Sequence, residues 1–244
     1  MAAALGWGLL AASSLVIGAL LGMARAWAPR PIGLVLAFGA GALISAVSFD
    51  LAEEGARLGD PGVLGVGLGA GAMTYFGLNR TIGRRSRRHS PRSGDPAPPA
   101  DAGPALALGA VLDGIPEQLV LGIGVAGAGG VSASLLVAIF VSNLPEAIGS
   151  ATEMRAAGTP PQAIRRLWLF VAAICTAAAV LGYAVADVVS GNMTAAVDGF
   201  AAGALLVMLI DSMIPTAVRD GGDVSGLATV LGFAVATALS GISG

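Results

Sequence analysis

Long apolar stretches recur along the whole chain, and short polar connections separate them. A membrane-spanning helix needs about 20 mostly apolar residues, and eight stretches of this sequence meet that requirement. An ordinary soluble domain, with about 25% charged residues, is excluded because 11% of this chain is charged. We therefore predict an all-α polytopic membrane protein. The expected spans are residues 1–24, 32–49, 61–79, 102–126, 131–151, 167–186, 193–218 and 224–243.

The placement of arginine predicts the orientation of these spans. All 13 basic residues are arginine, and twelve of them fall in inside loops if both termini lie outside. Inside loops of membrane proteins are rich in basic residues, so we expect a multi-pass protein of the plasma or inner cell membrane with both termini outside. Arginines follow the first stretch and do not precede it, which favours a retained span over the alternative of a cleaved signal peptide.

Residues 80–101 form the one low-complexity segment, which is rich in arginine, proline and serine. Such a composition cannot bury apolar surface, so we expect a disordered cytoplasmic loop. It divides the chain into spans one to three (1–79) and spans four to eight (102–244). A basic run can also bind lipid headgroups or nucleic acid, but a linker that sets topology is the plainer interpretation, and we expect no nucleic-acid partner.

Two internal matches indicate a repeat. Residues 38–43 align with 200–205 at a shift of 162, and residues 115–117 align with 144–146 at a shift of 29. In each match, the two spans are expected to cross the membrane in opposite directions. Short Gly/Ala-rich matches also arise by chance, yet together they predict an inverted repeat of three, two and three spans. This architecture is typical of secondary transporters, whose site lies near the midplane.

Several acids lie inside the predicted spans, where each costs about 2.5–3.5 kcal/mol on insertion scales. Asp198 lies near the start of its span, whereas Asp113, Glu117, Glu146 and Asp211 lie deeper. No basic residue lies inside a span to neutralise them. They must therefore be protonated or hold a bound cation.

Local spacing favours the cation. Asp113 and Glu117 are four residues apart and share a helix face, while Ser142 and Asn143 precede Glu146 by four and three residues. The proline before each glutamate frees a backbone carbonyl one turn earlier. Both helices thus offer oxygen ligands at one level, which predicts an all-oxygen cation site. The alternative is that the prolines are simple kinks and the protonated acids relay protons.

The segments Asp113-Gly-Ile-Pro-Glu117 and Ser142-Asn-Leu-Pro-Glu146 resemble the paired metal-binding motifs of the ZIP (Zrt/Irt-like) divalent metal transporters. The resemblance implies eight spans with both termini outside, a long loop after the third span, and a homodimer. It also implies that spans one, four, five and six move against the rest. The implied metal ligands are Asp113, Glu117, Ser142 and Glu146, with Asn143 as a partner in an adjacent site.

The chain departs from the family pattern at its ligands. Asp113 replaces a histidine, and Ser142 is a weak ligand, so we expect one bound ion. The resemblance favours zinc, whereas oxygen ligands suit manganese or iron better than imidazole does; cadmium is a further candidate. Cys175 lies in span six, where it is expected to pack in the interior, although a role in a second site stays open.

We expect a secondary transporter that moves divalent metal cations through a mid-membrane carboxylate site, with no resident cofactor. An enzyme is not expected, because lysine is absent and His89 lies in a loop. The alternative function is a proton-coupled carrier of a small organic solute, with the buried acids as proton relay. Asp50, Glu53 and Glu54 are candidates to attract cations to an entrance, the alternative being a solvated helix end. Asp211 is a candidate for the exit path, the alternative being a capped or protonated structural acid.

Overall fold

The computed structural model describes residues 1–25, 27–88, 102–126, 132–186 and 190–243, apart from the side chains of 82–88, 102–110, 112–113 and 241–243. Every described element is helical, which confirms the all-α prediction. The elements are α1 (Ala2–Ala24), α2 (Pro29–Ala46), η1 (Val47–Glu53), α3 (Glu54–Leu58), α4 (Pro61–Arg88), α5 (Ala102–Ala126), α6 (Ala133–Ala156), α7 (Pro161–Ala186), α8 (Gly191–Met208), η2 (Leu209–Met213), α9 (Ile214–Gly221), η3 (Gly222–Val224) and α10 (Ser225–Ser243).

Six helical segments of the described chain are long and apolar enough to cross a membrane. The last of them, Gly191–Ser240, covers 50 residues and includes a turn at Gly222, whose φ of 73° favours glycine. The part of α5 at Gly114–Ala126 is a shorter apolar helix. These lengths and compositions are those of a protein embedded in a membrane.

Proline marks where several helices begin. α2 begins at Pro29 and α7 at Pro161, ahead of the apolar stretches predicted from the sequence. Proline is tolerated at the first helical position because the amide there has no intrahelical partner. At its other end, α4 continues to Arg88 and so extends into the predicted loop 80–101; residues 89–101 lie outside the described residues.

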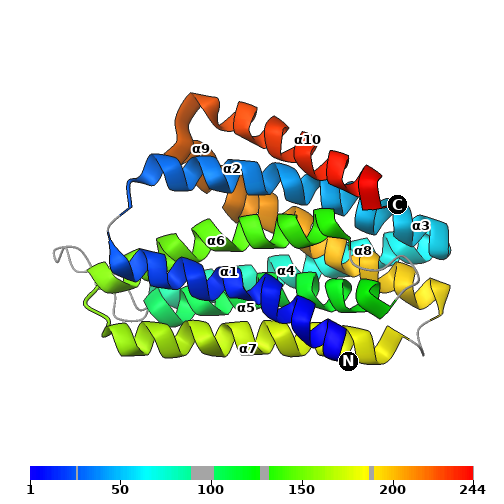
Figure 1. Ribbon diagram of the computed structural model, residues 1–244, viewed down its shortest axis with the longest axis horizontal. Coiled ribbons are helices and arrows are strands. Elements are labelled where there is room, and N and C mark those ends of the chain that lie inside the picture. Colours follow the sequence, from blue (N-terminus) through cyan, green and yellow to red (C-terminus); the bar gives the residue numbers. More distant parts are fainter. Residues whose placement is uncertain (26, 89–101, 127–131, 187–189, 244) are drawn as a thin grey trace.

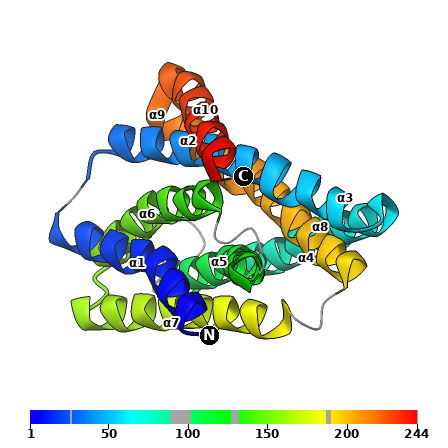
Figure 2. The same cartoon turned by 45° about the vertical axis from the view of Figure 1, so that its right-hand side comes forward.

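The helices run lengthwise beside one another, with α10 along the outer side of α2 and α7 on the opposite side of the bundle (Figures 1 and 2). Both chain termini lie toward one end, which we call the terminal end (Figure 1). At the other end α1 connects to α2, α6 connects to α7, and α9 finishes. We call this the arginine end, because these helix ends carry Arg25, Arg30, Arg155, Arg165, Arg166 and Arg219.

Close backbone contacts at glycine join the outer helices to the bundle. A Cβ atom at Gly41 of α2 would overlap the carbonyl oxygen of Thr229 in α10, and one at Gly203 of α8 would overlap that of Leu68 in α4. Small residues allow helices to approach this closely in lipid. The two glycines are 162 residues apart, the same shift as in the sequence match. The residues that they meet are 161 apart, so the two contacts are equivalent to within one residue.

A second pair of contacts joins the central helices. A Cβ atom at Gly182 of α7 would overlap the carbonyl oxygen of Leu119 in α5, and one at Gly22 of α1 would lie against that of Ile148 in α6. Leu119 and Ile148 are 29 residues apart, which is the second shift found in the sequence. The packing of α1 on α6 therefore resembles the packing of α7 on α5.

Two π-helical turns interrupt the long helices at matching places. η1 begins at Val47 and η2 begins at Leu209, again 162 residues apart. A π turn holds one more residue than an α turn and is frequent at functional sites. Each turn therefore changes which residues its helix presents to the centre of the bundle.

The glycine contacts give a first prediction. Replacing Gly203 by alanine is expected to lower the free energy of unfolding by about 1–3 kcal/mol, because the added methyl group overlaps α4 and overpacks the contact. Gly69→Ala on α4 is the matched control, since nothing lies within 4 Å of a Cβ atom at that position. Thermal melting of the detergent-solubilised protein measures both variants. Equal melting temperatures for the two would contradict the predicted contact.

Candidate functional site

Two proline-containing helices bring four of the five predicted metal ligands to one cavity. Glu117 of α5 and Ser142, Asn143 and Glu146 of α6 all line it. Each helix contains a proline directly before its glutamate, so a backbone carbonyl one turn earlier lacks its usual amide donor. The fifth predicted ligand, Asp113, is one helical turn before Glu117, and its side chain lies outside the described residues.

Glu117 is the most deeply buried acid of the site. Its residue is 1% exposed, and the Nδ2 atom of Asn143 donates a hydrogen bond of 3.4 Å to its Oε2 atom. The carboxyl group of Glu146 is its electrostatic neighbour. Ser142 is also buried, and its hydroxyl group donates to the carbonyl oxygen of Ile139 at 3.1 Å. The deep end of the cavity therefore gathers two carboxylates, an amide and a hydroxyl group.

Contacts with α1 and α2 hold these residues in place. A Cβ atom at Gly39 of α2 would lie 3.0 Å from the Cα atom of Ser142, and Gly18 of α1 packs against α6 from another side. On α5, the Nε2 atom of Gln118 donates to the carbonyl oxygen of Gly8 in α1 at 3.3 Å. Glycine at these contacts sets how deeply the polar turn of α6 is buried.

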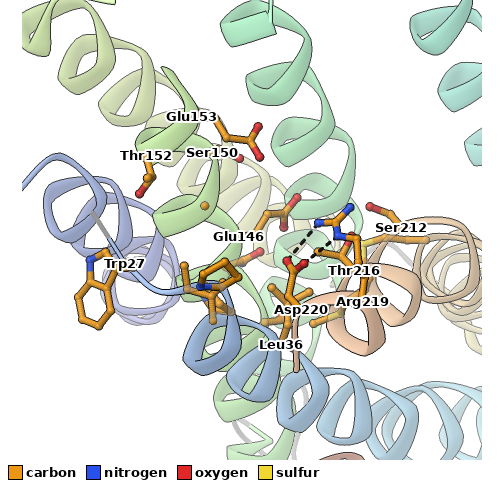
Figure 3. A pocket seen from close by; sticks show the side chains of 18 of the residues that line it. Trp27, Leu36, Glu146, Ser150, Thr152, Glu153, Ser212, Thr216, Arg219 and Asp220 are labelled. Atoms are coloured by element: carbon orange, nitrogen blue, oxygen red, sulfur yellow. Dashed lines mark hydrogen bonds and ion pairs between the residues drawn. The ribbon is translucent and has the colours of Figure 1, made fainter. Parts of the chain in front are cut away.

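The cavity has a volume of about 390 Å³ and extends from Glu117 to the arginine end. α6 forms one side of it, and η2 and α9 form another (Figure 3). Its buried residues lie at the deep end, whereas Glu153 and Arg219 are exposed. We call this exposed part the mouth; it comprises Trp27, Glu153, Thr216, Arg219 and Asp220. The polar site is thus connected to the arginine end.

Hydrogen bonds join two helices at the terminal end. The carboxylate of Asp50 in η1 accepts from the hydroxyl groups of Ser132 at 2.9 Å and Ser134 at 2.6 Å. Ser132 also caps α6, since its Oγ atom accepts from the amide of Leu135 at 3.1 Å. Asp50, which the sequence suggested for an entrance, therefore holds the start of α6 against η1.

The other acids predicted along a pathway lie outside the cavity described above. Glu53 is exposed, and Glu54 forms an ion pair with Arg57. Asp211 is exposed on η2, and its neighbour Ser212 lines the cavity. The structure therefore brings four of the five predicted ligands together but brings neither these three acids nor Asp50 to them.

Sequence reasoning missed the mouth of the cavity. Glu153 follows Glu146 by seven residues, which is two turns on the same face of α6, so the spacing could have identified it. Thr216 and Asp220 carried no such signal, because their position depends on how α9 packs against the rest of the bundle. Cys175 is fully buried in an apolar core shared by α1, α6 and α7, as expected for a packing residue.

The chemistry of the deep end is that of oxygen ligands. Among the residues with described side chains, no group of three or more His, Cys, Asp or Glu is placed to hold a metal ion. The donors there are two carboxylates supplemented by the amide of Asn143 and the hydroxyl of Ser142, a set that suits hard divalent cations. No protein-family model and no curated protein matches the chain.

The cavity predicts a pattern of thiol accessibility. Ser212→Cys places a thiol in the cavity lining and is expected to react with a water-soluble maleimide added on the side of the arginine end. Ser134→Cys is the control, because Ser134 is buried beside Asp50 and a thiol there is expected to be protected. The native Cys175 is fully buried, so the background is low. Mass spectrometry of labelled membranes reads the result, and equal labelling of both variants would refute the proposed opening.

Proposed function

We propose that the protein is a ZIP-like secondary transporter of divalent metal cations, which it binds between Glu117 and Glu146. The observation that carries the proposal is that these two carboxylates share the deep end of a cavity inside an apolar helix bundle. Acidic side chains inside a membrane are expensive. A bound dication compensates both at once, and Asn143 and Ser142 add oxygen ligands.

We further propose eight spans arranged as an inverted repeat of three, two and three. The first pair of equivalent contacts, at Gly41 and Gly203, supports a relation between spans two and seven. The second pair, at Gly22 and Gly182, supports a relation between the central helices. Such repeats underlie alternating access, in which one group of helices moves against another around a fixed site. By resemblance, the moving group comprises α1, α5, α6 and α7, and the protein is a homodimer.

Orientation follows from charge. The positive-inside rule places the arginine end in the cytoplasm and both termini outside, in the plasma or inner cell membrane. The cavity then opens to the cytoplasm, and the Asp50 hydrogen bonds to Ser132 and Ser134 lie at the opposite, outer end. This arrangement is an inward-facing state, in which a bound ion is released into the cell.

The ligands of the site affect which ion it binds. Resemblance to the ZIP family favours zinc. Compared with imidazole, oxygen ligands shift the preference of a site towards manganese or iron. Cadmium is a further candidate. We place zinc first and treat the metal as transported substrate.

A second candidate is a proton-coupled carrier of a small organic solute. The mouth of the cavity favours it, because Trp27 and Arg219 supply the aromatic and basic contacts that such a solute requires. Transport that continues in the presence of a metal chelator would identify this alternative.

Metal uptake by the purified protein in proteoliposomes tests the first proposal. Glu117→Gln and Glu146→Gln are each expected to reduce uptake at least about tenfold, since even a residue that only supports a metal ligand contributes that much. Glu153→Gln, on the same helix as Glu146 but at the mouth, is the matched control and should retain most activity. Full uptake by both deep-site variants would refute the proposal.

The replacement of the family's histidine generates a separate prediction. Asp113→His is expected to raise the ratio of zinc to manganese uptake. Imidazole suits zinc, whereas carboxylate suits harder ions such as manganese. Competition between the two ions in the same vesicles measures this ratio. An unchanged ratio would show that ligand hardness does not determine the ion preference. It would not contradict metal transport itself.

A further inference from the structure

The described lining of the cavity holds one basic side chain among several acidic ones. Its lining contains four carboxylates, at Glu117, Glu146, Glu153 and Asp220, and the guanidinium of Arg219. The first two acids occupy the deep end, and the other two flank the mouth. A dication that leaves the deep end toward the arginine end passes both mouth acids. These acids would by themselves attract it.

Arg219 is held at the mouth by a two-point contact. Its Nε atom donates to Oδ1 of Asp220 at 2.7 Å, and its Nη2 atom donates to Oδ2 at 3.1 Å. Such paired charge-assisted bonds orient the guanidinium as well as attract it. Glu153, across the mouth on α6, is a further electrostatic neighbour of Arg219. Figure 3 shows this group between α9 and α6. The guanidinium thus acts on both mouth acids.

Asp220 is fixed by backbone packing. A Cβ atom at Gly33 of α2 would lie 2.9 Å from the Cβ atom of Asp220, so α2 and the end of α9 are in close contact. The side chain of Asp220 is 19% exposed, whereas that of Arg219 is 70% exposed. A nearly buried carboxylate therefore anchors a guanidinium that projects into the opening.

We propose that Arg219 is a tethered counter-cation that prevents the mouth from retaining the transported metal ion. The inference rests on the proposed transport function and assigns a role to a residue outside the metal site. By neutralising Asp220 and weakening the field of Glu153, Arg219 removes a second stopping point on the exit path. It acts through these two carboxylates and does not touch the bound ion.

Many exposed ion pairs contribute little to stability. A second exposed ion pair in this chain serves as a control for that case. Arg57 precedes Arg219 by 162 residues and pairs with Glu54 at the terminal end, outside the described cavity lining. Arg57→Gln removes an exposed arginine–carboxylate pair without changing the mouth. Arg219→Lys keeps the positive charge but loses the two-point contact.

The test measures equilibrium binding of Zn²⁺ and of Mn²⁺, each alone, to the purified full chain by calorimetry, together with uptake in proteoliposomes. Arg219→Gln is expected to bind metal on the order of threefold more tightly, the scale of an exposed charge pair, and to transport it more slowly at saturation. Arg219→Lys should stay near the wild-type values, and Arg57→Gln should match the wild type. The gain in binding should vanish at about 1 M salt, where charges are screened within about 3 Å.

Each outcome has a distinct meaning. Unchanged or weaker binding by Arg219→Gln, or a gain that persists in high salt, overturns the role of Arg219. A damaged fold cannot imitate the expected result, because damage weakens binding instead of tightening it. If Glu117→Gln binds metal as tightly as the wild type, the proposed metal site fails instead. If Glu117 is required and Arg219→Gln has no effect, the counter-cation alone fails.

Discussion

Direct contact between helix backbones is the constraint on which the rest of this structure depends. A Gly/Ala-rich chain in a bilayer gains little from apolar side chains facing one another, because lipid is equally apolar, and helices associate mainly through close packing. Here Gly41, Gly203, Gly22 and Gly182 each bring a helix against a carbonyl oxygen of its neighbour. The contacts at Gly22 and Gly182 position α6 and α5, and those helices carry the acids. The polar site therefore exists because small residues surround it.

Much of this organisation could be predicted from the sequence. Apolar stretches predicted the helices because length and hydropathy are local properties, and the Pro-Glu spacing predicted that Glu117, Ser142, Asn143 and Glu146 would meet. The mouth of the cavity could not be predicted in the same way. Thr216, Arg219 and Asp220 reach it through the packing of α9 on α2, and no periodicity within one segment encodes a contact between segments so distant in the chain.

The acids at the two ends show why charge alone is a poor guide to a pathway. Asp50 and Glu54 belong to one acidic cluster in the sequence, yet Asp50 binds two serines at the start of α6 while Glu54 pairs with Arg57. Asp211 is exposed while its neighbour Ser212 lines the cavity. In the second case a difference of one residue separates the two environments, because adjacent positions on a helix point about 100° apart. The role of such an acid therefore depends on which face of its helix it occupies as well as on its charge.

The π turn η2 has a consequence for comparing this chain with others. One inserted residue rotates everything downstream by a fraction of a turn. The cavity is lined on both sides of this turn, by Met208 before it, by Ser212 and Met213 within it and by Thr216 after it. A gap-free alignment to a protein whose corresponding helix is uninterrupted would therefore misplace the helix faces that follow the turn. Deleting a single residue within 209–213 should therefore be less disruptive than an equal deletion elsewhere in the helix, since a regular α turn can absorb it.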